Sequence, residues 1–96
     1  MHQSTQNTNF CDLIDPSQRL TIDEMRPHME ILVFISNKNE CLRHTVSHTT
    51  AGHPGKMFVF CDNGFYYDNT HTFYKYDKVT KTMLLLDPSL TIRDFT

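Results

Sequence analysis

The sequence predicts an α+β fold, in which short N-terminal helical turns pack on a mainly antiparallel, partly curled sheet of five or six strands. Two observations lead to this prediction. Helix-capping residues cluster between residues 15 and 24, and from residue 29 onward short segments rich in β-branched and aromatic residues alternate with turn-forming Asn, Asp, Gly and Pro. The chain has 96 residues, which is enough for one hydrophobic core.

The helix signals lie near the N-terminus. Pro16 suits the first position of a helix, where its missing N–H group costs nothing. Thr21 and Glu24 have the spacing of a capping box. Because Pro27 cannot continue a helix, we predict one or two short helical turns between residues 16 and 26.

Extended segments account for the rest of the chain, and each one ends at a turn. Asp62-Asn63-Gly64 is a strong hairpin turn, and Asp68-Asn69-Thr70 is a second turn. The predicted strands are 29–36, 56–61, 65–67, 71–76, 82–86 and 90–95.

The segment 40–50 fits two structures. Thr45 and Val46 are β-branched and favour a strand. Asn39 as an N-cap and Gly52 as a terminator favour a helix. We favour the strand and keep the helix as the alternative.

Three predicted strands, 29–36, 57–61 and 82–86, carry apolar residues at both odd and even positions. Such strands need cover on both faces. The N-terminal turns can cover one face, and the other face needs either a curled sheet or a partner. We therefore expect contact with another protein or with a second copy of this chain.

Composition and charge narrow the function. The net charge is −2 with His neutral, which gives no attraction to nucleic acid or to an anionic membrane. The longest apolar run, Ile31–Ile35, is too short to cross a bilayer, and the first ten residues lack the features of a signal peptide. We expect a cytoplasmic protein that binds neither nucleic acid nor membrane, with a disordered Gln/Asn/Thr-rich tail at 1–9 and a single globular domain at 10–96.

Cys41, His44 and His48 are the strongest candidates for a metal site, because Cys and His are the ligands that zinc prefers. On a helix their spacing would place all three on one face. On a strand His44 and His48 would lie about 13 Å apart, and Cys41 would point to the opposite face. The favoured strand therefore predicts no metal and no cofactor, with these histidines on the surface of a polar edge strand.

A thiol-dependent enzyme would need a Cys beside a base. Cys41 and Cys61 are candidates, with His44, His48 or His71 as bases, but no local signature links any pair. Cys61 lies in an apolar strand, where a free Cys is typically a small core residue. We predict no catalytic residue and keep a metal- or thiol-dependent enzyme as an alternative function.

Tyr66, Tyr67, Tyr74 and Tyr76 are the candidate binding residues, because a Tyr-rich, charge-poor surface is typical of protein interfaces. Neighbouring strand residues point to opposite faces, so at least one of Tyr66 and Tyr67 should be exposed. If Phe73 faces the core, Tyr74 and Tyr76 face outward together; in the alternative, these two form the core face. Tyr rings can also stack on unpaired bases, so a single-stranded nucleic-acid binder is a second alternative function.

The sequence thus predicts a small protein-binding module. The prediction depends on the lack of catalytic and cofactor motifs, on strands that need cover on both faces, and on the Tyr-rich hairpins. Small chains of this plain kind are common among virus- and phage-encoded inhibitors of host defence. We expect this chain to be an inhibitor of that class, with a host defence protein as its partner.

Overall fold

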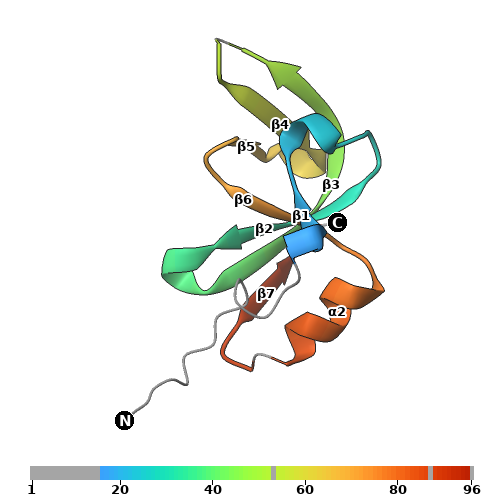
Figure 1. Ribbon diagram of the computed structural model, residues 1–96, viewed down its shortest axis with the longest axis vertical. Coiled ribbons are helices and arrows are strands. Elements are labelled where there is room, and N and C mark those ends of the chain that lie inside the picture. The colour runs from blue at the N-terminus through green and yellow to red at the C-terminus, as the bar shows by residue number, and fades with distance from the viewer. Residues whose placement is uncertain (1–15, 53, 87, 96) are drawn as a thin grey trace.

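The computed structural model describes residues 16–52, 54–86 and 88–95, so the predicted tail at 1–9 lies outside the described residues. Its main element is a seven-stranded sheet in the order β1-β6-β2-β3-β4-β5, with β7 paired to β3 (Figure 1). All the strand pairs are antiparallel except β3 and β7. The strands are β1 (Arg19–Leu20), β2 (Glu30–Ile35), β3 (Glu40–Ala51), β4 (Met57–Cys61), β5 (Tyr66–Asp68), β6 (Thr72–Lys75) and β7 (Thr91–Asp94). The mainly antiparallel sheet is confirmed, with one strand more than the upper end of the prediction.

Single 3-10 turns flank β1 where the sequence predicts helical turns. They are η1 (Pro16–Gln18) and η2 (Ile22–Glu24). At η2 the backbone N–H of Thr21 donates to Oε1 of Glu24 at 2.9 Å, as a capping box requires. The chain is extended again at Met25 (φ −79°, ψ 147°), and β1 pairs with β6. In the described residues the predicted N-terminal helical turns are therefore reduced to two single 3-10 turns, and the segment between them belongs to the sheet.

The predicted strand at 82–86 is wrong, because this segment belongs to helix α2 (Lys78–Leu85). Asp77 is the N-cap: its Oδ1 accepts from the N–H of Thr80 at 3.1 Å, and its own N–H donates to Thr80 Oγ1 at 2.8 Å. Thr80 and Leu84 lie one turn apart and are the buried residues of the helix. The Asp77 cap marks the start of a helix, whereas the apolar run 82–86 at the end of the helix resembles a strand when it is considered alone. No helix in the described part of the chain is long and apolar enough to cross a membrane.

The segment 40–50, for which the sequence allows a strand or a helix, is a strand, because β3 runs without a break from Glu40 to Ala51. Its first half pairs with β2 and β7, and its second half pairs with β4. The register shifts at a β-bulge between Val46 and His48. A bulge inserts an extra residue and changes which positions share a face, so residues of the same parity lie on opposite faces before and after it.

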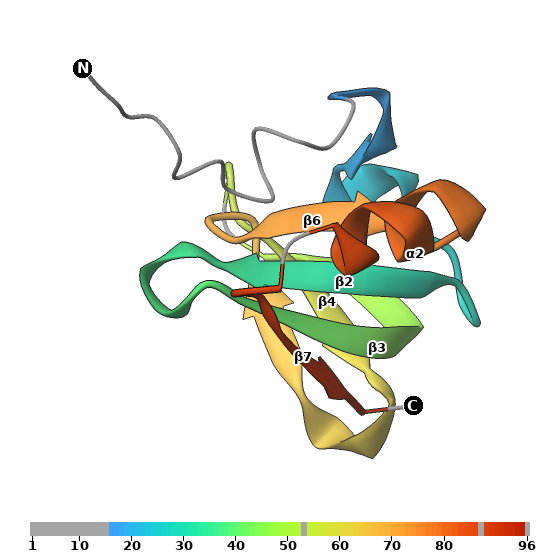
Figure 2. The same cartoon turned by 90° about the horizontal axis from the view of Figure 1, so that it is seen from below.

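Two buried clusters lie on opposite faces of β2. The inner core lies within the bend of the sheet, and it joins β1 and β4 although three strands separate them. The helix-side core lies beneath α2, which Figure 2 shows against one face of β2 and β6. The buried residues of the inner core are Leu20, Ile22, Met25, Ile31, Val33, Val46, Val59, Cys61 and Phe73. Those of the helix-side core are Leu32, Phe34, Cys41, Tyr74, Leu84 and Leu90.

Alternate residues of β2 supply the two cores. Ile31 and Val33 belong to the inner core, and Leu32 and Phe34 belong to the helix-side core. All four are less than a tenth exposed. Both faces of this strand are covered by the chain itself. For β2, the structure therefore removes the two-sided apolar pattern as a reason to expect a partner or a second copy.

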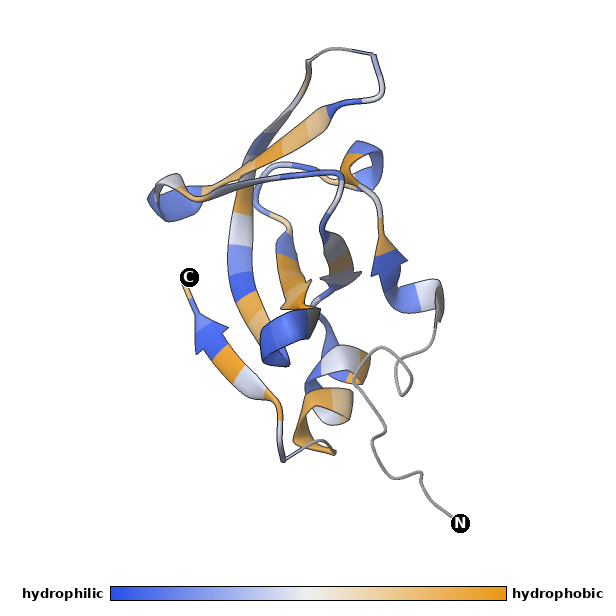
Figure 3. Cartoon of the chain, turned by 90° about the vertical axis from the view of Figure 1, so that its left-hand side faces the viewer, coloured by the Kyte–Doolittle hydropathy of each residue, from blue (hydrophilic) through white to orange (hydrophobic). Residues whose placement is uncertain are grey.

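The C-terminal strand β7 pairs with β3 in parallel, and two ion pairs also join the two strands. All four residues of β7 are exposed, and Figure 3 shows it as mostly hydrophilic beside the C-terminus. Arg43 Nη1 lies 2.9 Å from Asp94 Oδ2, and Arg93 Nε donates to Glu40 Oε2 at 2.9 Å. The predicted extended piece at the C-terminus is thus confirmed as a strand, with parallel pairing to β3.

Candidate functional site

Three aromatic side chains form a stacked row on the outer face of β3, β4 and β5. We call His48, Phe60 and Tyr66 the outer aromatic row. His48 pairs with Phe60 and Phe60 pairs with Tyr66 in the strand register. The ring centroids of His48 and Phe60 are 4.8 Å apart with planes 6° apart, and those of Phe60 and Tyr66 are 5.6 Å apart with planes 25° apart. Tyr66 is 62% exposed, His48 is exposed and Phe60 is half-buried, so the row faces solvent.

Strand alternation fixes the direction of this row. Val59 and Cys61 belong to the inner core, so Phe60 between them points to the opposite face. Cross-strand partners share a face, which places His48 and Tyr66 on the same outer side.

A turn and a bulge place the outer partners of Phe60. Asn63 (φ 73°) and Gly64 (φ 85°) take the left-handed conformation that the tight connection from β4 to β5 requires. This connection sets Tyr66 opposite Phe60. The β3 bulge sets His48 opposite Phe60 as well. The row therefore depends on one feature that the sequence shows, the Asn-Gly turn, and one that it does not show, the bulge.

His44 lies on the inner face of β3, in an aromatic enclosure. It is fully buried, its ring stacks on Phe95 (centroids 4.9 Å, planes 7° apart), and Phe65 lies at 5.1 Å. Its Nε2 is 2.7 Å from the hydroxyl oxygen of Tyr67, whereas its Nδ1 has no hydrogen-bond partner among the described residues. Burial lowers the pKa of His44, so its neutral form is favoured. The expected surface position is correct for His48 but wrong for His44.

The four predicted tyrosines do not form one surface. Tyr66 is exposed, and Tyr67 points inward, where burial and then the Cys61 side chain raise its pKa to about 12. Tyr74 is 4% exposed and lies in the helix-side core, which is the alternative that the sequence left open for this ring. Tyr76 is half-buried, with the Arg43 guanidinium 4.5 Å from its ring centroid. Only Tyr66 presents most of its ring to solvent.

Phe73 and Tyr74 are both buried because β6 lies between β1 and β2, with a core on each face. Phe73 enters the inner core and Tyr74 the helix-side core. From the sequence we inferred that if one of these two side chains is buried, the other is exposed. This inference holds only for a sheet with a single covered face.

The thiols and the other histidines do not assemble into a reactive centre in the described structure. Cys61 is buried in the inner core, and burial together with the charge of Asp62 raises its pKa to about 11, which disfavours a nucleophilic thiolate. Cys41 lies in the helix-side core, on the opposite face of β3 from His44. Among residues 16–52, 54–86 and 88–95, no group of three His, Cys, Asp or Glu side chains could hold a metal ion.

Sequence reasoning missed two members of the outer aromatic row. Phe60 follows from the hairpin, since the turn at 62–64 together with the inward Val59 predicts an outward ring opposite Tyr66. His48 could not be found in this way, because unbroken alternation from His44 would have placed it on the inner face.

The comparisons with known proteins found no family model, no curated protein and no solved structure that matches this chain. The assignment of a function therefore depends on the geometry described above.

Proposed function

We propose that this chain is a protein-binding module whose contact surface is the outer aromatic row. The observation that supports the proposal is the stacking of His48, Phe60 and Tyr66 in the open, with Tyr66 62% exposed. Buried Tyr and other aromatic side chains supply much of the binding energy at protein interfaces. A row of such rings that no described part of the chain covers is the kind of apolar patch that marks an interaction site.

The row is also suited to binding because its rings hold one another in place. Ordering a free side chain costs binding energy when a complex forms. Phe60 stacks on His48 on one side and on Tyr66 on the other, so its ring orientation is set before a partner arrives. The nearby charge pair of Lys56 Nζ and Asp68 Oδ2, 3.3 Å apart, adds a polar margin of the kind found at interface rims.

The charges around the row argue against the alternative of single-stranded nucleic acid. Between Arg43 and Lys75 the chain contains one Lys, Lys56, and no Arg. Lys56 pairs with Asp68, which is the residue two positions beyond Tyr66. Stacking rings bind nucleic acid tightly only when cations neutralise the phosphates. A protein partner is therefore the better match. The inhibitor role expected from the size of the chain belongs to this same proposal.

Site-specific photocrosslinking tests the surface. Thr50 is exposed and lies two residues beyond His48 on β3, and Leu85 is 83% exposed on α2. In extracts of the source cells, Thr50→p-benzoylphenylalanine should capture a protein that Leu85→p-benzoylphenylalanine does not. Capture of the chain itself would identify a second copy as the partner.

Binding of the captured protein is then measured with variants. Tyr66→Ala should weaken binding roughly 30-fold, which corresponds to the loss of about 2 kcal/mol at an interface anchor. Leu85→Ala is the control and should bind like the wild type. The proposal fails if Tyr66→Ala, Phe60→Ala and His48→Ala all bind the captured protein with wild-type affinity, or if equal capture occurs at both crosslinking positions.

A further inference from the structure

The second half of β3 has one side without a neighbouring strand. On its other side this half pairs with β4. The contacts with β2 and with the residues before β2 end at Val46. Beyond Val46, no strand in the part of the chain that the structure describes pairs with β3 on that side. Figure 1 shows this end of β3 extending with β4 away from the rest of the sheet. We call residues 47–51, on the side opposite β4, the free edge.

The ladder with β4 fixes which backbone groups lie at the free edge. The N–H of Gly52 donates to the carbonyl of Lys56 at 3.0 Å. In an antiparallel ladder every second residue bonds to the same neighbour. Thr50 therefore directs its N–H and C=O groups to β4, whereas Thr49 and Ala51 direct theirs to the free edge. Among the described residues these outward groups have no hydrogen-bond partner, so they are available to a further strand.

The side chains of the free edge do not protect it from pairing. Edge strands are commonly blocked by charged residues, by Pro or by being very short. Residues 47–51 read Ser-His-Thr-Thr-Ala, with no Pro, Lys, Arg, Asp or Glu, and after the β-bulge they continue in regular register from His48. By contrast, β7 carries Arg93 and Asp94, and the end strands β1 and β5 have two and three residues. The free edge is therefore the part of the described sheet that is most open to strand addition.

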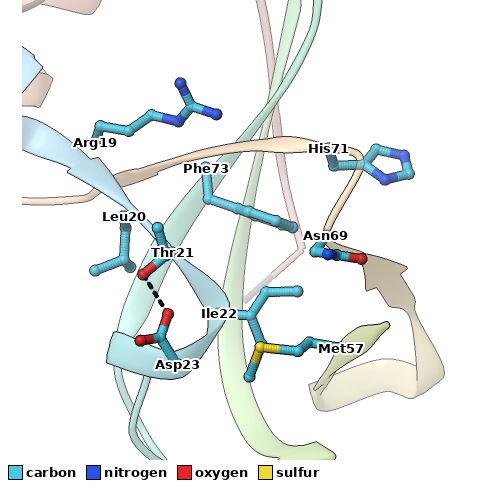
Figure 4. Close-up of a pocket in the computed structure, with 9 residues that line it drawn as sticks. All are labelled: Arg19, Leu20, Thr21, Ile22, Asp23, Met57, Asn69, His71 and Phe73. Atoms are coloured by element: carbon cyan, nitrogen blue, oxygen red, sulfur yellow. Dashed lines mark hydrogen bonds between the residues drawn. The ribbon is translucent and has the colours of Figure 1, made fainter. Parts of the chain in front are cut away.

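The inner face beside the free edge is already covered by the chain. Met57 pairs with Ala51 in the register, and Figure 4 shows Met57 beside Ile22 of η2. Ile22 is 3% exposed and belongs to the inner core, against which Met57 packs. Thr50 and Ala51, in contrast, are exposed. An added strand would therefore extend the sheet sideways and would not need to enter the core.

We propose that the free edge binds the free edge of a second copy of this chain, in the antiparallel direction and about a twofold axis at Thr49. Thr49 exchanges two N–H···O bonds with Thr49 of the second copy, and Ala51 lies opposite Ser47 of that copy. Because the outward residues lie two apart, an axis through one of them brings the outward residues of both copies opposite each other. Charge also favours this occupant, since with His neutral neither edge brings a like charge to the other. The inference does not rest on the outer aromatic row.

Amide hydrogen exchange, followed by NMR in dilute and concentrated samples of the full chain, tests the pairing at single residues. At millimolar concentration sedimentation should show a dimer, and exchange at the N–H of Thr49 should be at least about fivefold slower than in the dilute sample, because pairing protects this group. The N–H of Thr50 is the internal control, since it bonds to β4 in both states. A strict monomer at millimolar concentration, or a dimer without slower exchange at Thr49, would overturn the proposal.

Variants separate edge pairing from contact through the outer aromatic row. Thr49→Pro removes an N–H that the fold of one copy does not use, and Pro is tolerated at such edge positions. This variant should stay monomeric where the wild type dimerises, whereas Thr49→Val keeps the N–H and should dimerise normally. Tyr66→Ala changes the outer aromatic row and should also dimerise normally. If folded Thr49→Pro dimerises like the wild type, or if Tyr66→Ala alone abolishes the dimer, the second copy is not held by the free edge.

Disulfide crosslinking tests the register without relying on the Pro variant. Cα atoms of a hydrogen-bonded antiparallel pair lie about 5.5 Å apart, within the range of a disulfide. In a Cys11→Ser background, where the remaining Cys41 and Cys61 are buried, Thr49→Cys should form a disulfide-linked dimer on mild oxidation. Ala51→Cys is the control, because the two copies of this residue would lie about 14 Å apart along the strands.

Crosslinking at neither position, or equally at both, would overturn the proposed register. A last measurement places p-benzoylphenylalanine at Thr49 in extracts of the source cells, where the chain should capture itself. Capture of a different protein alone would assign the free edge to a strand of that protein and would also overturn the proposal.

Discussion

Strands β3, β4 and β5 carry two rows of side chains that are neighbours in sequence but differ in environment. The outer aromatic row faces solvent, whereas an inner row on the same strands faces the inner core. The inner row is Thr49, Val59 and Tyr67, paired across the strands. Each of its members stands next to a member of the outer row. The two rows therefore differ because they lie on opposite faces of the same strands, and not because they belong to different segments.

The two adjacent tyrosines show what this difference means chemically. The hydroxyl of Tyr67 lies 2.7 Å from His44 Nε2, and its pKa is raised to about 12. Tyr66 is 62% exposed and stacks on Phe60. The same side chain thus serves as a hydrogen-bonded core group in one row and as a presented ring in the other. The curl of the sheet decides which, because it encloses one face and leaves the other open.

The largest expected effect is on the inner row. Val59 is fully buried, so Val59→Ala should lower the free energy of unfolding by about 2 kcal/mol through lost burial and a residual cavity. Urea denaturation measures this change. The matched control is Val79→Ala, where the valine is 47% exposed on α2, and its effect should stay within about 0.5 kcal/mol. Equal losses at the two valines would contradict the division between the faces.

Acid should destabilise the protein through the inner face. The pKa of His44 is lowered from its ordinary value of 6.5 in the folded state by burial, so below that value the unfolded chain binds more protons. The free energy of unfolding should be constant between about pH 7 and 8 and should fall below about pH 6.5, by at most about 1.4 kcal/mol per pH unit. Asp68 and Glu24 also have lowered pKa values, but from ordinary values of 3.8 and 4.5, so they act in a more acidic range.

Matched histidine variants locate this acid effect. His44→Phe should remove the slope between pH 5 and 6.5, because the new ring fits the aromatic enclosure and cannot take up a proton. This pH window is about that in which histidines titrate. His48→Gln, in the outer row, should leave the slope unchanged. If the slope survives in His44→Phe, another group is responsible.

Removal of the hydroxyl group from each of the two tyrosines should give a smaller difference in stability between the two faces. Tyr67→Phe removes the hydroxyl that meets His44 and should cost about 1 kcal/mol of stability, as for a typical internal hydrogen bond. Tyr66→Phe removes an exposed hydroxyl and should cost almost nothing. Thermal unfolding of the two variants under identical conditions measures both. Equal costs would show that Tyr67 is not a core group.

The smallest expected effect concerns the stability contributed by the outer row itself. His48→Ala breaks the stacking on Phe60 in an exposed position and should lower the free energy of unfolding by about 0.5 kcal/mol. Urea denaturation of this variant, beside wild type, provides the measurement. A loss of 2 kcal/mol or more would make the row a structural cluster and would weaken its proposed role in binding.

Several features of the fold and the site follow from the sequence alone. The Asn-Gly turn at 63–64 specifies the β4–β5 hairpin, because both residues tolerate a positive φ. The apolar pattern of β2 correctly indicates a strand covered on both faces. Strand alternation correctly requires Tyr66 and Tyr67 to differ in exposure. These features depend only on local conformation and on the two-residue period of a strand.

Tertiary structure decided the remainder. Nothing local announces the bulge that turns His48 outward. The identity of the cover on β2 depends on α2, whose apolar end resembles a strand until its Asp77 cap is taken into account. The burial of Tyr74 depends on β6 lying between two other strands. In each case the sequence pattern is compatible with two environments for a residue. Which environment it occupies is set by contacts with segments far away in the chain, and these form only when the sheet bends and the helix packs on it.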